Sequence, residues 1–222
     1  NRRGVRQMTT LFTDDDVVAV AARESAEFPL WLPTVARLPG ATMGAILRGT
    51  RSLLVRGLAS EGEKELVIHT EASDRIGPFV QTRWRHRCFS YTTVTSFPVA
   101  AGGGLVFADN RSDRWFVDEV STFGIHSIRA SSGDEFETSA RAFLDTRDST
   151  FPVGGGLGKR GKTIAVYSEG LSMQLIVKTE DGFYLAGAAA RPDLPVAVPG
   201  SDFAFRRIDE AEAAGHLGVA DP

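Results

Sequence analysis

The stretch LVFADNRSDRWFVDEV, residues 105–120, decides the fold class. Two apolar segments, Leu105–Ala108 and Trp115–Val120, lie on either side of a polar turn at Asn110–Asp113. Apolar segments of this length that are separated by a polar turn are typical of a β-hairpin. The middle of the chain therefore predicts an antiparallel sheet.

The hairpin belongs to a longer run of strands that ends in a helix, over about residues 85–146. Phe123–Arg129 predicts the next strand, and Ser132-Gly133-Asp134-Glu135 has the spacing of a helix capping box. The helix that follows carries its apolar residues on one face: Phe136, Ala140, Phe143 and Leu144.

A second run with the same order follows at about residues 162–217. Asp181-Gly182, between two apolar segments, is the strongest hairpin-turn signal in the chain. Further strands are predicted on either side of it, and then a short helix near 209–217. The predicted strands are Ile164–Ser168, Met173–Lys178, Phe183–Ala186 and Phe203–Arg207.

Together these patterns predict an α+β fold, an antiparallel β-sheet with flanking helices. We expect one domain over residues 8–222, with two quasi-repeated β-meander-plus-helix lobes at about 8–150 and 160–222. Residues 1–7 are expected to be disordered or a non-native extension, because chain termini are usually poorly ordered.

Helices are also predicted ahead of the sheet. Thr13 followed by Asp14–Asp16 is typical of a helix start, since acidic side chains favour the positive end of the helix dipole. This helix is expected to run to about Ser25 with Val17, Val18 and Ala21 facing inward. Residues 41–58 predict a second helix, in which six residues recur at helical spacing: Met43, Ile46, Leu47, Thr50, Leu53 and Leu54. A helix over 72–82 requires Pro78 near its start.

Composition favours an ordinary globular protein. Hydrophobic residues make up 42% of the 222 residues, which argues against wholesale disorder. The net charge of -3 gives no general attraction to nucleic acid or to anionic membranes. A single cysteine, Cys88, excludes an intramolecular disulfide, and no apolar run reaches the length of a membrane span. We expect a cytoplasmic protein.

One motif matches a phosphate-binding loop. Residues Gly156–Thr163 satisfy the pattern G-x-x-x-x-G-K-[ST], which cradles phosphate when a helix follows it. The next residues, Ile164–Tyr167, favour a strand instead. We therefore interpret the motif as a basic, glycine-rich linker.

The helix at 41–58 allows an alternative function. It ends in Arg56-Gly57-Leu58 ahead of a short strand, similar to the recognition helix and wing of DNA-binding regulators. Arg48, Arg51 and Arg56 would then contact phosphates. The other interpretation, that they form the solvated face of an amphipathic helix, is the one we favour.

No catalytic set emerges from the sequence. Ser172 lacks the second glycine of a nucleophile elbow. The histidines, which are His69, His86, His126 and His216, lack the spacing of metal ligands. We expect neither enzyme activity nor a cofactor or metal.

The order of elements resembles that of the EspG-like chaperones of ESX (type VII) secretion. The features that carry the resemblance are Phe28-Pro29-Leu30, Arg56-Gly57-Leu58, Leu105–Asn110, Asp113–Val117 and Asp181–Leu185. The tail from Ala188 onward is rich in proline and departs from the helical C-terminal part of that family. The resemblance implies a cytosolic, non-enzymatic chaperone that binds a helical PE–PPE substrate pair before export.

Such a chaperone needs an exposed apolar patch on a rigid sheet, rimmed by polar groups. Phe97-Pro98-Val99, followed by the glycines 102–104, is a candidate binding loop with Phe97 and Val99 as anchors. Trp115 lies near it in the sequence pattern and is either a further anchor or part of the core. We favour the core, because large aromatic side chains are usually buried.

Overall fold

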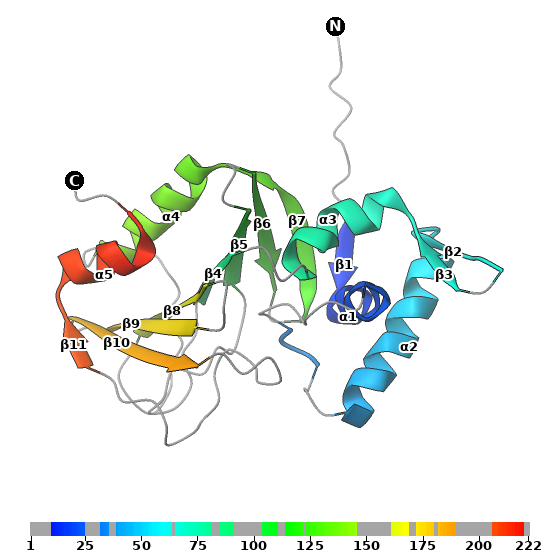
Figure 1. The fold of residues 1–222 in the computed structure, drawn as a ribbon, viewed down its shortest axis with the longest axis horizontal. Coiled ribbons are helices and arrows are strands. Elements are labelled where there is room, and N and C mark those ends of the chain that lie inside the picture. Colours follow the sequence, from blue (N-terminus) through cyan, green and yellow to red (C-terminus); the bar gives the residue numbers. More distant parts are fainter. Residues whose placement is uncertain are drawn as a thin grey trace, which may run out of the picture.

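The computed structural model describes residues 10–24, 32–35, 39–63, 65–80, 85–90, 104–110, 114–121, 123–145, 161–168, 172–179, 182–189 and 206–219. Within them the chain is a mixed α+β fold built on antiparallel strands, as predicted from the sequence (Figure 1). The predicted binding residues Phe97, Pro98 and Val99 and the linker Gly156–Arg160 lie outside the described residues.

Nine strands of the described residues form one antiparallel sheet, in the order β1-β7-β6-β5-β4-β8-β9-β10-β11. Strands β4 and β8 pair at its centre, and β1 and β11 form its two edges. The bounds are β1 (Leu11–Thr13), β4 (Arg85–Ser90), β5 (Gly104–Asp109), β6 (Trp115–Val120), β7 (Ile125–Ser131), β8 (Gly161–Ser168), β9 (Ser172–Thr179), β10 (Gly182–Ala189) and β11 (Arg206–Ile208). A separate hairpin pairs β2 (Ala59–Glu61) with β3 (Leu66–Ile68).

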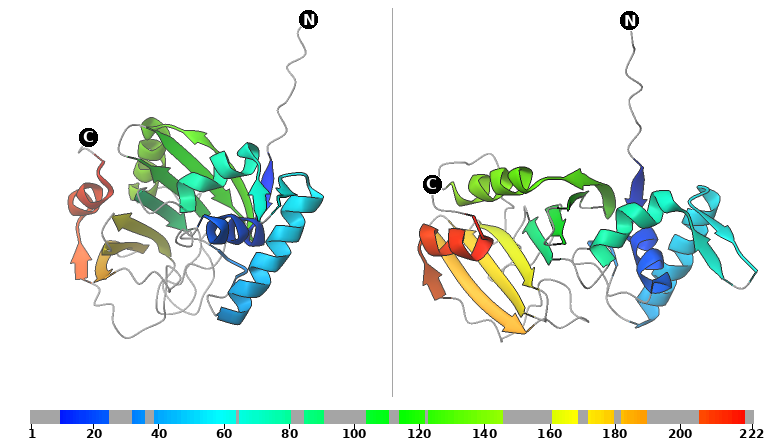
Figure 2. Two further views of the ribbon diagram at one scale, coloured as in Figure 1. Left: turned by 45° about the vertical axis from the view of Figure 1, so that its right-hand side comes forward. Right: turned by 45° about the horizontal axis from the view of Figure 1, so that its top comes forward.

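Helices cover both faces of the sheet, because successive side chains of a strand point to opposite sides. In β5, Val106 and Ala108 join a core with α1 (Asp14–Arg23), α2 (Pro39–Val55) and α3 (Thr70–Val80). Phe107, which lies between them, joins a second core with α4 (Gly133–Leu144) and α5 (Glu210–Leu217). Figure 2 shows the two helical groups at opposite ends of the sheet.

Both predicted hairpins are confirmed. Strands β5 and β6 pair with Phe107 opposite Val117, and β9 and β10 pair with Thr179 opposite Gly182. Gly182 adopts a φ of 128°, a conformation that residues with a side chain rarely adopt. The strand predicted at Phe123–Arg129 begins two residues later, because Phe123 and Gly124 form the turn that precedes β7.

The capping signals also predicted the helix starts correctly. Thr13 and Asp16 form the reciprocal capping box of α1, and Ser132 accepts a hydrogen bond from the Glu135 amide at the start of α4. The predicted apolar face of α4 is buried in the second core: Phe136, Ala140, Phe143 and Leu144.

Both runs contain four strands followed by a helix, namely β4–β7 with α4 and β8–β11 with α5. The two runs meet at β4 and β8, so that the strand order reads outward from the centre in each direction. An origin by duplication stays a prediction, because the order of elements alone does not establish it.

Helix α1 is the centre of the first core. Val17, Val18 and Ala21 are buried as predicted, and Ala19 and Val20 are buried as well. The predicted inward face was therefore too narrow, because the neighbouring elements cover α1 on more than one side.

The predicted apolar face of α2 was correct at Leu53 and Leu54, which pack in the first core, and wrong at Met43 and Leu47. Ala45, Gly49 and Leu53 are the residues of α2 that are buried, whereas Met43 and Leu47 are exposed. The reason lies at Gly49, where a Cβ atom would stand 1.9 Å from the Asp15 carbonyl oxygen of α1. Helix α2 turns its smallest residues to α1 so that the two backbones approach closely.

The prediction that Pro78 lies near a helix start was also wrong. Pro78 is buried near the C-terminal end of α3, which spans Thr70–Val80. Proline lacks the backbone N–H that would donate to the carbonyl four residues earlier. Because Pro78 lies close to the end of α3, few helical hydrogen bonds follow it that could be disrupted.

We predict that Gly49→Ala destabilises the protein by about 2–3 kcal/mol, because a methyl group there overlaps the α1 backbone. Gly40→Ala is the matched control in the same helix, since no atom lies within 4 Å of its added Cβ. Urea unfolding followed by circular dichroism measures both free energies. Equal stability of the two variants would contradict the close approach of α1 and α2.

Candidate functional site

Three buried side chains form a charged cluster between α1 and the sheet. His126 of β7 lies between two carboxylates, with Nε2 2.6 Å from Asp14 Oδ1 and Nδ1 2.6 Å from Asp118 Oδ2. All three residues are buried. Because both ring nitrogens face acceptor oxygens, both carry protons and the ring is an imidazolium.

Each member is positioned by its own element. Asp14 is the first residue of α1, which the Thr13 capping box starts at this point. Asp118 and His126 come from the paired strands β6 and β7, on the face that α1 covers. Gly124, with a φ of 68°, leaves room for Asp14, since a Cβ there would stand 2.5 Å from Asp14 Oδ2.

The second oxygen of Asp14 holds the segment ahead of α2. Asp14 Oδ2 accepts hydrogen bonds from the Thr34 amide and the Thr34 hydroxyl, both at 2.6 Å. The backbone amide of Asp14 donates to the Gly124 carbonyl at 2.9 Å. One residue thus joins α1, the β6–β7 turn and the chain that leads into α2.

Burial is the largest influence on the pKa of His126 and would by itself lower it. The Asp118 carboxylate, by its charge and its hydrogen bond, and then Asp14 act in the opposite direction. Together they raise the pKa of His126 from 6.5 to about 9. The ring is therefore charged at neutral pH, where its charge offsets those of the two buried carboxylates.

A second ion pair lies beside this cluster. Arg56, just after α2, donates to the buried Asp16 carboxylate at 2.8 Å and also to the Leu11 carbonyl. Its guanidinium carbon lies 5.8 Å from the centre of the Phe12 ring. Arg56 therefore fixes the end of α2 against β1 and α1.

The geometry of the cluster favours a structural role over a catalytic one. A general acid or base must reach a substrate, whereas His126 is 1% exposed and both of its nitrogens are engaged. Across the described residues, no group of three or more His, Cys, Asp or Glu side chains is arranged to hold a metal ion. We assign the cluster to the positioning of α1.

Sequence reasoning missed the cluster. It assigned Asp14–Asp16 to helix capping alone and treated the histidines as scattered, because His126 and Asp14 are 112 positions apart. The available signal was the strand pattern, since polar Asp118 and His126 stand at inward positions of apolar strands. A buried polar side chain requires a partner.

Trp115 packs into the second core. Its ring stacks on Phe136 of α4, with the ring centres 5.1 Å apart and the planes at 21°. The side chain stays partly exposed, so the residue belongs to the rim of that core. Trp115 thus packs against the core without being enclosed by it, and its role as a binding anchor stays a prediction.

The clearest exposed apolar surface lies on α2. Met43, Leu47 and Val55 are 57%, 56% and 87% exposed, and they are three of the six exposed large apolar side chains in the described part of the chain. We call these three residues together with Arg51, which is exposed on the same helix, the α2 surface. Residues 43, 47, 51 and 55 are four apart and therefore form one row along the helix.

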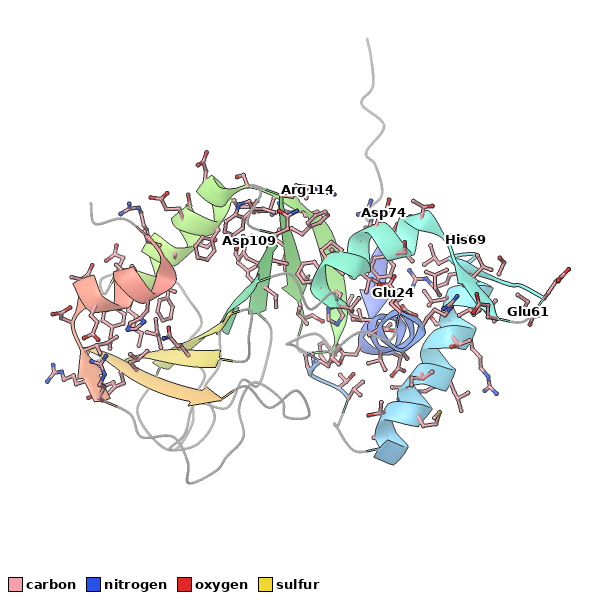
Figure 3. The ribbon with its side chains drawn as sticks, viewed as in Figure 1. Glu24, Glu61, His69, Asp74, Asp109 and Arg114 are labelled. Carbon is pink, nitrogen blue, oxygen red and sulfur yellow. The ribbon has the colours of Figure 1, made fainter. Side chains whose placement is uncertain are left out.

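Two of the three arginines proposed for DNA binding, Arg48 and Arg56, have partners within the chain. Arg48 makes a two-pronged ion pair with Asp15, at 2.7 and 2.9 Å, and Arg56 is held by Asp16. A β2–β3 hairpin does follow α2, but Glu61, Glu63 and Glu65 are exposed on it. Figure 3 shows Glu61 on this hairpin, at the outer end of the molecule. These carboxylates repel phosphate, which favours a structural role for the arginines.

The end of the phosphate-loop motif lies in a strand. Gly161, Lys162 and Thr163 are the first residues of β8, which runs to Ser168 in the centre of the sheet. A phosphate loop needs a helix N-terminus at this point. The predicted strand after the motif is confirmed, and the remainder of the motif lies outside the described residues.

No protein-family model matches the chain, and a search of curated proteins finds no similar sequence. Within the described residues, every helix is too short or too polar to cross a lipid bilayer.

We predict that the free energy of unfolding falls as the pH rises from about 6.5 to about 9.5. Folding raises the pKa of His126 to about 9, so its stabilisation is complete below 6.5 and is lost as the pH rises through about 9. A shift of this size corresponds to about 3 kcal/mol. Urea titrations at a series of pH values measure the slope.

His126→Gln is expected to be less stable at pH 7 and to lose most of this slope, because glutamine does not titrate. His69→Gln is the matched control, since His69 is exposed. A wild-type slope in the His126→Gln variant would refute the assignment of the charge to His126.

Proposed function

We propose that this chain is a cytosolic adaptor or chaperone that binds a helical protein partner. The observation that carries the proposal is the α2 surface, on which large apolar side chains stand in solvent along a well-packed helix. Exposed apolar rows of this kind are typical of surfaces that bind another protein.

The rigidity of α2 supports a binding role. Its opposite face is fixed to α1 at Gly49, and its end is fixed by the Arg56–Asp16 ion pair. A surface that does not rearrange on binding loses little conformational entropy. The apolar row is therefore presented in a fixed orientation.

The resemblance to EspG-like chaperones suggests the kind of partner. A PE–PPE pair has a hydrophobic helical tip that must be kept soluble until export through a type VII system. We propose that the α2 surface and the loop with Phe97, Pro98 and Val99 are two candidate contact sites for such a pair. Trp115 is a further candidate at the rim of the second core.

The test is co-purification of the tagged chain from its native cells, with mass spectrometry of the bound proteins. We expect a PE–PPE-type pair in stoichiometric amount. Met43→Ser with Leu47→Ser should reduce its recovery at least tenfold, because each buried apolar side chain contributes about 1.5–3 kcal/mol. Phe97→Ser with Val99→Ser tests the loop in the same way.

Phe123→Ser is the control, because Phe123 is an exposed apolar side chain that lies in the β6–β7 turn and not on α2. All variants should unfold at the urea concentration of the parent chain. Recovery of the parent chain without any helical protein pair would refute the chaperone proposal. Full recovery with one double variant would exclude that surface.

A further inference from the structure

We propose that the α2 surface binds an amphipathic helix of a partner protein. Carboxylates flank the apolar seam of this helix in its central turns. A basic residue lies at the end of the helix that is placed over the β2–β3 hairpin. This inference rests on the proposed binding function and adds the chemistry of the partner. It comes from the charges that surround the exposed row.

The middle of the α2 surface is basic. Helix α2 contains two arginines, Arg48 and Arg51, and no acidic residue. Arg51 stands in the apolar row between Leu47 and Val55, is exposed, and has no ion-pair or hydrogen-bond partner among the described residues. Arg48 shares its charge with Asp15, so Arg51 is the cation that remains for a partner.

The end of the α2 surface is acidic. The chain turns after Val55 through Gly57, which has a φ of 67°, and enters β2, which packs against α2. Glu61 and Glu63 are exposed on this hairpin, whereas Glu65 shares its charge with Arg23 in an ion pair of 2.6 Å. The charge therefore changes sign from the centre of the row to the hairpin beyond its C-terminal end.

A helix that covers the row meets these charges in a fixed order. Its apolar side chains pack between Met43, Leu47 and Val55, and its central carboxylates face Arg51. A lysine or arginine at its end faces the hairpin carboxylates. Such complementarity selects the partner and its orientation more than it raises the affinity.

The same charges disfavour a lipid surface. A basic amphipathic helix can lie on an anionic bilayer, but its neighbours must then be basic or neutral. The exposed carboxylates of Glu61 and Glu63 on the adjoining hairpin would approach the same bilayer and be repelled. A protein helix, which can carry both signs of charge, satisfies both parts of the surface.

The experiment uses two fluorescent helical peptides of eighteen residues with the same leucine seam. The first carries Glu beside the seam in its central turns and Lys in both terminal turns, and the second has these charges exchanged. Fluorescence anisotropy with the full chain should show at least tenfold tighter binding of the first peptide, which corresponds to about 1.4 kcal/mol. Arg51→Glu should abolish this preference, and Leu47→Ser should abolish the binding of both peptides.

Arg114→Glu and Phe123→Ser are the matched controls, because both residues are exposed at other sites and their substitution should leave binding unchanged. Equal affinity for the two peptides, or a preference that survives Arg51→Glu, would overturn the inference. Phosphatidylserine vesicles form a third arm, in which binding that Leu47→Ser removes would assign the surface to membranes and also overturn it.

The peptide experiment and the co-purification experiment can fail independently of each other. If a PE–PPE pair is recovered but the peptides are bound without charge preference, only the present inference fails. If the first peptide is preferred but no such pair is recovered, only the family assignment fails.

Discussion

The arrangement of the first core depends on the hydrogen bonds of the Asp14 carboxylate. One of its oxygens accepts a hydrogen bond from His126 and the other from Thr34, and Asp14 itself is buried, where an unpaired charge is strongly disfavoured. Asp14 can satisfy both partners only if α1 starts at this point above β6 and β7. Helix α2 then packs on α1 through Gly49, so the direction of the α2 surface follows from the same contact. A purely apolar contact would allow α1 to slide, because hydrophobic burial has no direction, whereas the short hydrogen bond that the His126 imidazolium donates to Asp14 fixes the register of α1.

The exposure of Met43 and Leu47 follows from a competition between two faces of one helix. One face has larger apolar side chains and the other has Ala45, Gly49 and Leu53. Burying Met43 and Leu47 would gain more transfer free energy, but it would separate the two helix backbones and turn the small residues outward. Close packing along Gly49 brings the backbones of α1 and α2 together and gains dispersion contacts along both helices. The apolar row that remains has no role inside the described residues, which is why it indicates a partner.

Local signals in the sequence were sufficient for most of the elements. The polar turn residues predicted both hairpins correctly. Thr13 and Ser132 predicted two helix starts, where their side-chain oxygens accept hydrogen bonds from backbone amides. The predicted buried face of α4 was correct because the large apolar residues of this helix lie on a single face. In α2 two faces competed, and helical periodicity does not rank them. The His126 cluster could not be predicted, because it requires the strand register and the position of α1, and no local pattern contains these.

The placement of apolar surface distinguishes a helical binding site from a sheet-based one. A chaperone of the proposed kind was expected to bind through an apolar patch on the sheet. The two helical groups cover opposite faces of the strands: β5 sends Val106 and Ala108 under α1–α3 and Phe107 under α4 and α5. The apolar side chains of β5 are therefore used within the two cores, and three of the six exposed large apolar side chains of the described residues lie on α2. A partner that docks on α2 does not have to displace a core helix, so binding can proceed without unfolding either core.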